Sequence, residues 1–320
     1  MDAIRNAVAN DFDAVNQLII DELHSDVGLV ESIGHYIVDA GGKRMRPILV
    51  LLSAMAHGYQ GKQHIELAAV IEFIHTATLL HDDVVDISSL RRGRPTANAE
   101  WGNAPSVLVG DFIYSRAFQL LVRIGHMDIM QLTANTTNRI AEGEVLQLEM
   151  AGKPDTTEST YHQIIERKTA ILFEAATRGG AILANSSEPE CIRAGAYGHN
   201  LGMAFQLIDD VLDYRGDAAT MGKNLGDDLA EGKPTLPLIF TMREGSQQQR
   251  DLVTHAISNK TAENLDQILT AVNETGALDY TEQQAIEHQS LALAALSELP
   301  ANNYRTQMER LAVLAVKRDH

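Results

Sequence analysis

The hydrophobic residues of the chain recur at helical spacing over most of its length. In the first such stretch, residues 8–24, apolar side chains including Val8, Phe12 and Val15 fall on one helix face. The same pattern predicts further helices over residues 64–89, 103–124, 128–150, 159–185, 190–214 and 234–243. Residues 246–320 are rich in Ala, Leu, Glu and Gln, which favour helix. Alternating strand patterns are nearly absent, so the sequence predicts an all-α fold.

Glycine and proline interrupt these helices without dividing the chain into domains. The breaks fall at residues 41–47, 91–95, 151–154, 186–189 and 216–237. None of them is a long linker rich in Gly, Ser or Pro, and the composition does not shift along the chain. We therefore expect a single large helical domain over residues 1–320.

The charge balance limits the classes of partner that the protein can bind. Lys and Arg number 26 and Asp and Glu number 43, which gives a formal net charge of −17 at pH 7. Such an acidic chain lacks the general positive surface that nucleic acids require, so we expect no nucleic-acid partner. Any phosphate group must instead be bound by local basic clusters or by a metal ion.

Two further features bear on the cellular compartment. Cys191 is the only cysteine, which excludes an intrachain disulfide and a cysteine-rich zinc site and is typical of the reducing cytosol. Residues 1–15 carry early acids and lack the apolar core of a signal peptide. No apolar stretch approaches the ~20 residues needed to span a bilayer. The sequence therefore predicts a cytoplasmic protein.

Two acidic motifs of the form DDxxD carry the strongest chemical signal. Asp82 and Asp86 lie one helical turn apart, as do Asp209 and Asp213, so each pair shares a helix face. Paired carboxylates repel each other unless a cation lies between them, and Mg²⁺ prefers such oxygen ligands. A single motif of this kind is more often a solvated acidic face. Here both copies lie within aliphatic sequence, which favours two metal-binding walls.

Cationic residues cluster around the acidic motifs. The clusters are Lys43, Arg44 and Arg46 after Gly41-Gly42, then Arg91, Arg92 and Arg94, then Lys168 beside Thr169, and finally Lys223 and Lys233 around Asp227-Asp228. Arginine contacts two phosphate oxygens at once and lysine provides a point charge, so these clusters suit phosphate groups. Any one of them alone would be read as ordinary surface cations. Four such clusters in an acidic chain favour anion binding.

Two polar residues within apolar helices have a structural alternative. His75 precedes Asp82 by seven residues and shares its helix face, although a lone histidine in such a helix is more often structural. Gln206, three residues before the second acidic motif, could equally be structural. Other chemistries find no support, because GxSxG and HExxH motifs are absent and residues 226–233 depart from a P-loop. A metal phosphohydrolase built on His81-Asp82 would leave the second acidic motif unexplained.

In combination, these motifs resemble those of the trans-prenyltransferases, the (E)-polyprenyl diphosphate synthases. The segments that carry the resemblance are GGKRMRP, EFIHTATLLHDDVVD, RRGRPTAN, GDFIYSRAF, AEGEVLQLE, KTA, FQLIDDVLDY, GKNLGDDLAEGKPTLPLI and LAVLAVKRD. The combination is highly specific. The resemblance implies an all-α fold of the isoprenoid synthase type, with a central cavity between two aspartate-rich helices.

The resemblance also implies a role for each motif residue. Mg²⁺ that bridges the allylic diphosphate would be bound by Asp82, Asp86 and Asp209, with Asp83, Asp210 and Asp213 as supporting catalytic carboxylates. The allylic diphosphate would contact Arg91, Lys168, Thr169, Gln206, Lys223 and Lys233. Isopentenyl diphosphate would contact Lys43, Arg46, His75 and Arg92. The implied reaction is a Mg²⁺-dependent head-to-tail condensation of the two substrates, with farnesyl diphosphate as the expected primer.

The product length is expected to depend on the positions one turn before the first acidic motif. Short-chain members of the family carry a bulky aromatic residue there, whereas this chain has Ala77 and Thr78. These positions lie on nearly the same helix side as Asp82, so their small side chains leave room for a long product. The resemblance implies a product of around eight isoprene units (C40), as used for quinone side chains. The tunnel floor would then lie deeper, near residues such as Leu120 and Ile124.

Several alternatives stay open at this stage. A shorter-chain, geranylgeranyl-type synthase would share the same motifs. A terpene cyclase would have no use for Lys43, Arg46 and His75, and a non-catalytic subunit of a heteromeric synthase usually has eroded motifs. The resemblance further implies a homodimer. A very apolar product also suggests transient membrane contact during its release.

Overall fold

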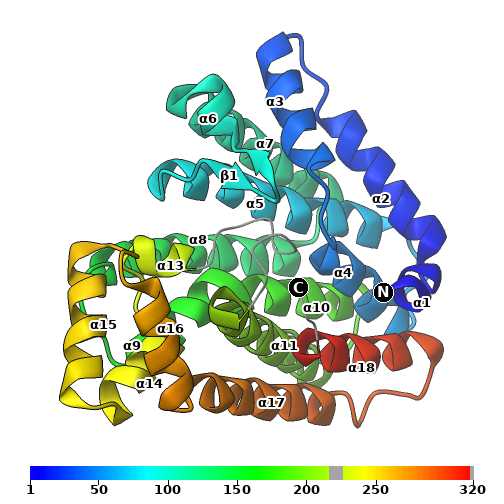
Figure 1. The fold of residues 1–320 in the computed structure, drawn as a ribbon. Helices are drawn as coiled ribbons and strands as arrows, with labels where there is room; N and C mark the ends of the chain where they lie inside the picture. The colour runs from blue at the N-terminus through cyan, green and yellow to red at the C-terminus, as the bar shows by residue number, and fades with distance from the viewer. Residues whose placement is uncertain (216–225, 318–320) are drawn as a thin grey trace. The chain divides into compact units, whose positions relative to one another are not determined.

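The computed structural model describes residues 1–215 and 226–317 and confirms the all-α class (Figure 1). Its elements are α1 (Asp2–Asn6), α2 (Ala9–Glu22), α3 (Gly28–Asp39), α4 (Met45–Ala56), α5 (Gln63–Val85), β1 (Leu90–Arg91), β2 (Arg94–Pro95), α6 (Ala97–Trp101), α7 (Asn103–Ile124), α8 (Met127–Met150), α9 (Glu158–Ile165), the π-helical turn η1 (Glu166–Ala170), α10 (Ile171–Leu183), α11 (Glu188–Arg215), α13 (Asp227–Ala230), α14 (Leu236–Glu244), α15 (Gln247–Asn259), α16 (Leu265–Glu274), α17 (Ala277–Ala295) and α18 (Asn303–Val316). The two strands pair antiparallel in a short hairpin.

The helix bounds follow the hydrophobic pattern closely, except at two places that matter for function. The helix predicted over residues 64–89 already ends at Val85, because the chain turns after Asp86 to enter the hairpin. The helix predicted over residues 159–185 is interrupted by η1, which separates α9 from α10. A π-helical turn takes up extra residues without ending the helix, so the spacing of apolar residues does not reveal it.

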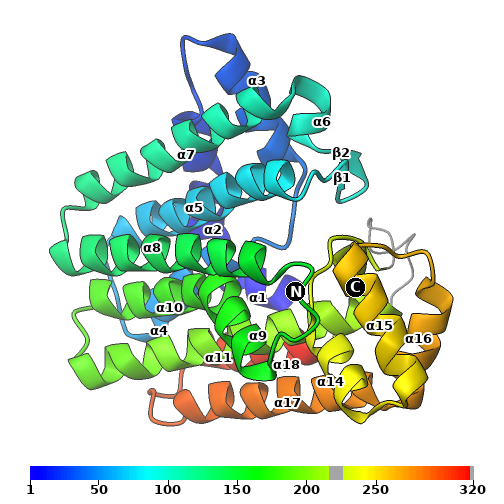
Figure 2. The ribbon, with the colours of Figure 1, turned by 90° about the vertical axis from the view of Figure 1, so that its left-hand side faces the viewer.

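One compact unit comprises residues 1–137, 172–198 and 293–311. Its central helix is α5, which packs against α2, α4 and α7, and α7 runs alongside it (Figures 1 and 2). Leu67 and Leu80, near its two ends, are at most 1% exposed. A helix that is apolar on most sides is stabilised by burial in a core, and this burial fixes the position of the acidic motif at its C-terminal end.

The second compact unit comprises residues 138–171, 199–292 and 312–320. One of its apolar clusters joins side chains of α9, α11 and α14, among them Tyr161, Leu207 and Leu236. A second cluster is built mainly from α14, α15 and α16. The acidic motif of α11 therefore lies among tightly packed apolar residues. The expectation of one domain over residues 1–320 stays a prediction.

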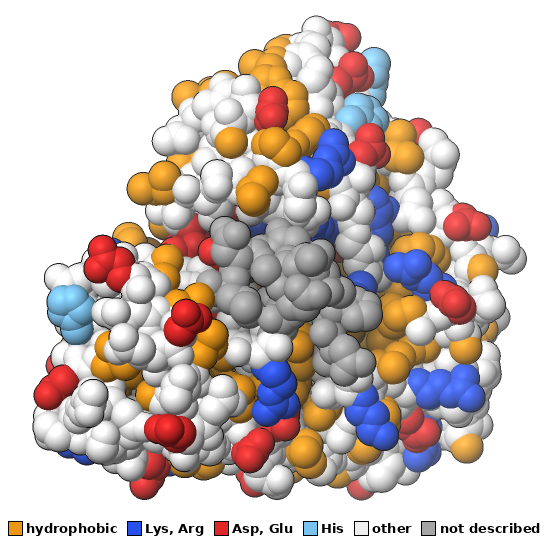
Figure 3. Space-filling model, viewed as in Figure 1, with side chains coloured by type: hydrophobic (Ala, Val, Ile, Leu, Met, Phe, Trp, Pro, Cys, Tyr) orange, Lys and Arg blue, Asp and Glu red, His pale blue; other side chains and the backbone are white. Residues whose placement is uncertain are grey.

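The surface of the described residues carries no large region of one charge sign on the face that Figure 3 shows. Lys and Arg side chains occur there singly or in small groups between acidic and hydrophobic ones. Among the described helices, none combines the length and the apolar character needed to cross a bilayer.

Candidate active site

The first acidic motif lies at the C-terminal end of α5. Asp82 and Asp86 are both partly exposed, and the Asp86 amide donates to the Asp82 carbonyl at 2.8 Å, which keeps them one turn apart. Asp83, between them, is fully buried. The helix end therefore presents two carboxylates to the outside and turns the third one inward.

The inward carboxylate of Asp83 binds the guanidinium of Arg91. Arg91 Nε donates to both carboxylate oxygens at 2.9 and 3.0 Å, and Nη2 donates to Oδ1 at 2.7 Å. Removing one partner of a buried ion pair leaves an uncompensated charge and costs about 3–5 kcal/mol. The pair thus ties the hairpin to the acidic motif and leaves Asp83 little freedom to bind a metal ion.

The hairpin brings Arg92 over the glycine turn that precedes α4. Arg92 and Gly93 form its two-residue turn with φ angles of 52° and 73°, as in a type I′ turn. A Cβ atom on Gly42 would lie 2.6 Å from Arg92 Nη1, and Gly42 has a φ of 136°. Only glycine satisfies both conditions, so the Gly41-Gly42 pair allows the guanidinium to approach the backbone.

A pocket in the same unit brings these elements together. Its lining residues are Ile37, Val38, Gly41, Arg44, Glu72, His75, Thr76, Leu79 and Arg92. Two of the four residues predicted for isopentenyl diphosphate, His75 and Arg92, therefore share one pocket. Lys43 and Arg46 lie outside this lining: Lys43 is exposed, and the Arg46 guanidinium stacks on the Phe173 ring at 4.6 Å.

The charges around this pocket shift the pKa of its titratable groups. Burial, assisted by the cations of Arg46 and Arg92, lowers the pKa of His75 well below its usual value, so His75 is neutral at pH 7. Burial raises the pKa of Glu72, although Arg44, Arg46 and Arg92 oppose this effect. The pocket thus gathers arginines around a neutral histidine and one acid, an arrangement that favours an anionic ligand.

The second acidic motif lies on α11, in the other unit. Asp209 is partly exposed, whereas Asp210 is buried. The Asp210 carboxyl accepts hydrogen bonds from Tyr161 Oη at 2.6 Å and from Gln206 Nε2 at 2.8 Å. Burial, reinforced by the nearby Asp228 carboxylate, raises the pKa of Asp210 to about 8. The second aspartate of this motif is therefore turned inward, as in the first motif.

Lys168 and Thr169 lie on the π-helical turn η1. Thr169 Oγ1 donates to Gln206 Oε1 at 2.9 Å, and Lys168 Nζ donates to Glu144 Oε2 at 2.8 Å. Gly143 lets α8 approach this turn closely, because a Cβ atom there would lie 3.0 Å from the backbone nitrogen of Lys168. Thr169 and Gln206, both predicted for the allylic substrate, are thus in direct contact.

The other predicted residues of this unit lie near the C-terminal end of α11 and beyond it. Asp213 is buried on α11. Lys233, between α13 and α14, forms an ion pair with Glu231. Lys223 lies outside the described residues.

The exposed carboxylates of the first motif fit a divalent cation that takes further ligands from outside the protein. Within residues 1–215 and 226–317, no three His, Cys, Asp or Glu side chains converge closely enough to hold a metal ion. Asp82 and Asp86 nevertheless offer oxygen donors one turn apart. Mg²⁺ typically binds one or two carboxylates and completes its shell with water and substrate phosphates. The donor set is therefore adequate for an ion that arrives with a diphosphate.

The two positions predicted to influence product length differ in accessibility. Ala77 is fully buried, whereas Thr78 is partly exposed. The Thr78 hydroxyl donates to the carbonyl of His75 at 2.8 Å. A larger side chain fits at Thr78 more easily than at Ala77, where it has to displace packed neighbours.

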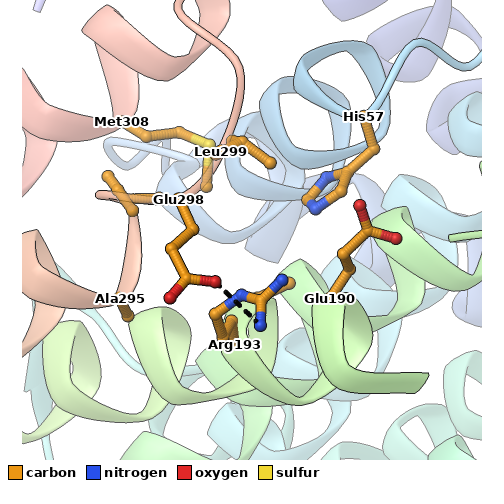
Figure 4. A pocket seen from close by; sticks show the side chains of 9 residues that line it. His57, Glu190, Arg193, Ala295, Glu298, Leu299 and Met308 are labelled. Atoms are coloured by element: carbon orange, nitrogen blue, oxygen red, sulfur yellow. Dashed lines mark ion pairs between the residues drawn. The ribbon is translucent and has the colours of Figure 1, made fainter. Parts of the chain in front are cut away.

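A second pocket in the first unit contains none of the predicted residues. It is lined by His57, Glu190, Arg193, Ala194, Ala295, Leu296, Glu298, Leu299 and Met308 (Figure 4). Arg193 Nη1 and Glu298 Oε2 form an ion pair of 3.1 Å within it. The His57 ring bonds the Ser53 carbonyl at 2.7 Å, so its Nδ1 carries the proton.

Two residues in these sites are missing from the sequence-based prediction. Glu72 lines the pocket of His75, and a lone acid three residues from that histidine on an apolar helix was the available signal. Tyr161 bonds Asp210, but in the sequence it resembles any core aromatic residue. Its role depends on a contact across 49 positions of the chain, which periodicity does not reveal.

Comparisons with known proteins give a consistent answer. The Polyprenyl synthetase family model matches residues 27–275. The chain is 49% identical over 320 residues to the octaprenyl diphosphate synthase of Escherichia coli, covering 100% of this chain and 99% of that protein. It is 52% identical over 313 residues to the all-trans-nonaprenyl-diphosphate synthase (geranyl-diphosphate specific) of Rhodobacter capsulatus, covering 97% of this chain and 96% of that protein.

A solved structure extends the likeness to three dimensions. The polyprenyl synthase from Caulobacter crescentus, crystallised in complex with calcium and isoprenyl diphosphate, has a TM-score of 0.97 and 42% sequence identity. The match covers 100% of this chain and 98% of that one. The resemblance drawn from the sequence motifs is confirmed, and the chain belongs to the polyprenyl synthetase family.

Proposed function

We propose that the protein is a Mg²⁺-dependent trans-prenyltransferase that extends an allylic diphosphate with isopentenyl diphosphate to octaprenyl diphosphate (C40). The observation that carries this proposal is the pocket of Arg44, His75 and Arg92 in the same unit as the Asp82–Asp86 motif. An enzyme that only ionises one diphosphate needs the acidic motif but has no use for a second anion pocket. Two diphosphate substrates account for both features.

The two substrates and the metal ion are assigned to different sets of residues. We assign isopentenyl diphosphate to the pocket of His75 and Arg92, with Lys43 and Arg46 as further contacts. We assign the allylic diphosphate to Arg91, Lys168, Thr169, Gln206, Lys223 and Lys233. Arginine and lysine stabilise the negative charge that develops on the departing diphosphate. A divalent cation bound by Asp82, Asp86 and Asp209 would neutralise further negative charge on that leaving group.

The carbon chemistry requires no protein nucleophile. Cleavage of the carbon–oxygen bond leaves an allylic cation and free diphosphate. The double bond of isopentenyl diphosphate then attacks the cation, and loss of a proton restores a double bond in the lengthened chain. The diphosphate that has just departed is the nearest base for this proton. The residues of the site bind and orient the two substrates and exclude water from them.

A shorter-chain synthase is the main alternative. It would use the same reaction but stop after fewer additions. The small side chains at Ala77 and Thr78 favour the longer product, as do the octaprenyl and nonaprenyl products named for the two relatives. A non-catalytic subunit is disfavoured because every acidic and basic motif is complete.

The proposal is tested by analysing the product. The purified full chain is incubated with Mg²⁺ and excess isopentenyl diphosphate, with either farnesyl or geranyl diphosphate as primer, and the products are identified by mass spectrometry. We expect a C40 diphosphate as the main species, no product in EDTA, and recovery when Mg²⁺ is restored. A C20 or C25 product would retain the reaction and overturn the chain length. No condensation would indicate a subunit that needs a partner.

A further inference from the structure

Tyr161 stands at one end of a chain of hydrogen bonds that ends at Thr169. Tyr161 Oη donates to Asp210 Oδ2 at 2.6 Å, and Asp210 Oδ1 accepts from Gln206 Nε2 at 2.8 Å. Gln206 Oε1 in turn accepts from Thr169 Oγ1 at 2.9 Å. All four residues belong to the same compact unit. We call them the Tyr161 relay.

The π-helical turn is what allows both ends of the relay to reach α11. Thr169 follows Tyr161 by eight residues, which in a regular α-helix would place the two side chains about 80° apart around the axis. A π-helical turn takes up one extra residue per turn. The turn at Glu166–Ala170 therefore returns Thr169 to the side of the helix on which Tyr161 lies. Turns of this kind are frequent at functional sites.

The two hydrogen bonds of Gln206 link Asp210 to Thr169 through opposite ends of one amide group. The amide nitrogen of Gln206 can only donate, so its contact with Asp210 turns the amide oxygen toward Thr169. The Thr169 hydroxyl has one hydrogen, which this oxygen accepts. The orientation of Thr169 therefore depends on Gln206, and that of Gln206 depends on the Asp210 carboxyl.

Packing alone does not explain why residue 161 is a tyrosine with a hydroxyl group. Tyr161 is 3% exposed within an apolar cluster, where phenylalanine would fill the same space without a polar group to satisfy. Its hydroxyl instead holds the second oxygen of Asp210, which is itself 2% exposed. A buried carboxyl with a donor on each oxygen has one defined rotamer.

From this arrangement we propose that Tyr161 is a positioning residue for the allylic diphosphate, acting through Asp210 and Gln206 on Thr169. The proposal rests on the proposed function, because that function gives Thr169 and Gln206 their substrate. Tyr161 itself touches neither substrate. Its hydroxyl sets the geometry of residues that do.

The test is a double-mutant cycle on steady-state kinetics with farnesyl and isopentenyl diphosphate. Tyr161→Phe removes the first hydroxyl of the relay and Thr169→Val removes the last, and both variants are also combined. We expect Tyr161→Phe to lower kcat/KM for farnesyl diphosphate roughly tenfold and to leave KM for isopentenyl diphosphate unchanged. In the double variant, the loss should be clearly smaller than the product of the two single losses, because the hydroxyls act through one chain.

Tyr197→Phe provides the matched control. Tyr197 is fully buried and its hydroxyl donates to the carbonyl of Met308 at 2.8 Å, in the other unit. This variant loses a buried hydrogen bond of the same type and should retain wild-type kcat/KM. Circular dichroism and thermal unfolding show whether each variant is folded.

Each outcome decides the proposal. Wild-type kinetics in Tyr161→Phe would overturn the relay and leave the proposed function intact, and so would losses that multiply in the double variant. Equal kinetic losses in Tyr161→Phe and Tyr197→Phe would reduce Tyr161 to a packing role. An inactive wild-type chain would overturn the proposed function and the relay with it.

Discussion

At the scale of single residues, the two acidic motifs share a division between exposed and buried carboxyls. Asp82 and Asp209 are partly exposed, whereas Asp83 and Asp210 are buried and bonded to other side chains. Asp83 holds Arg91, and Asp210 is held by Tyr161 and Gln206. The outer carboxylates therefore lie where a cation from solution can reach them, and the inner ones orient neighbouring residues.

The low pKa of His75 predicts that binding of isopentenyl diphosphate at its proposed pocket depends on pH. His75 is neutral in the ligand-free protein, because burial and the Arg46 and Arg92 cations disfavour its charged form. A bound diphosphate favours the protonated imidazole, so it raises the pKa of His75 and binding takes up protons. By linkage, the affinity increases as the pH falls through the ligand-bound pKa, by at most tenfold per pH unit for one proton.

We therefore expect KM for isopentenyl diphosphate to fall as the pH is lowered, and to fall less in His75→Gln. Titration of the diphosphate itself affects both proteins equally and cancels in the ratio of their KM values. Parallel KM profiles for the two proteins would show that His75 takes up no proton on binding.

The same pKa has the opposite consequence for the stability of the free protein. The unfolded chain protonates this histidine below about pH 6.5, whereas the folded chain resists protonation. Lowering the pH therefore favours the unfolded state. This loss of stability stops increasing once the pH falls below the pKa of His75 in the folded protein.

The relative placement of residues could be predicted where one helix supplies the whole pattern. The spacing of Asp82, Asp86 and His75 on α5 follows from the helical period alone. The Asp83–Arg91 pair does not, because it depends on a two-residue turn with positive φ at Arg92 and Gly93. No periodicity encodes that turn.

At the scale of elements, α5 combines the acidic motif, His75 and the positions expected to limit product length. Thr78 lies one turn before Asp82 and is partly exposed. We expect Thr78→Phe to shift the product from C40 to markedly shorter chains while the rate of the first condensation stays within a few-fold of wild type. Product mass spectra check this expectation.

Two matched variants separate steric block from other effects at this position. Thr78→Val removes the hydrogen bond to the His75 carbonyl without adding bulk and should keep the long product. Ala77→Tyr also adds bulk, but at a fully buried position, where overpacking costs about 1–3 kcal/mol. An unchanged C40 product from a folded Thr78→Phe protein would refute the tunnel assignment.

The elements themselves were predictable to different degrees. Long amphipathic helices such as α7 and α8 match the predicted 103–124 and 128–150 almost residue for residue. The prediction of one helix over residues 159–185 did not include η1, since one extra residue barely disturbs the spacing of apolar residues over so long a stretch. The spacing of apolar residues predicts η1 and the hairpin least well. These two segments carry Thr169 and Arg91.

At the scale of the whole molecule, α7 exposes two large apolar side chains on one of its faces. Leu108 and Val122 are 66% and 69% exposed. They are fourteen positions apart, about four helical turns, so they lie on nearly the same face, where the exposed side chains of Ser115 and Gln119 separate them. The homodimer implied by the resemblance provides a partner for this face, because a two-fold axis brings the same face of a second chain against it.

We accordingly expect light scattering to give a mass of about twice 35.0 kDa for the wild type and about half that for a Leu108→Lys, Val122→Lys double variant. Lysine at these positions places like charges against each other across the two-fold axis, which is unfavourable in an apolar interface. Ile192→Lys is the control, since Ile192 is 54% exposed and lies on α11 rather than on α7. It should stay dimeric. A monomeric wild type would remove the homodimer from the proposal, and a dimeric double variant would place the interface elsewhere on the protein.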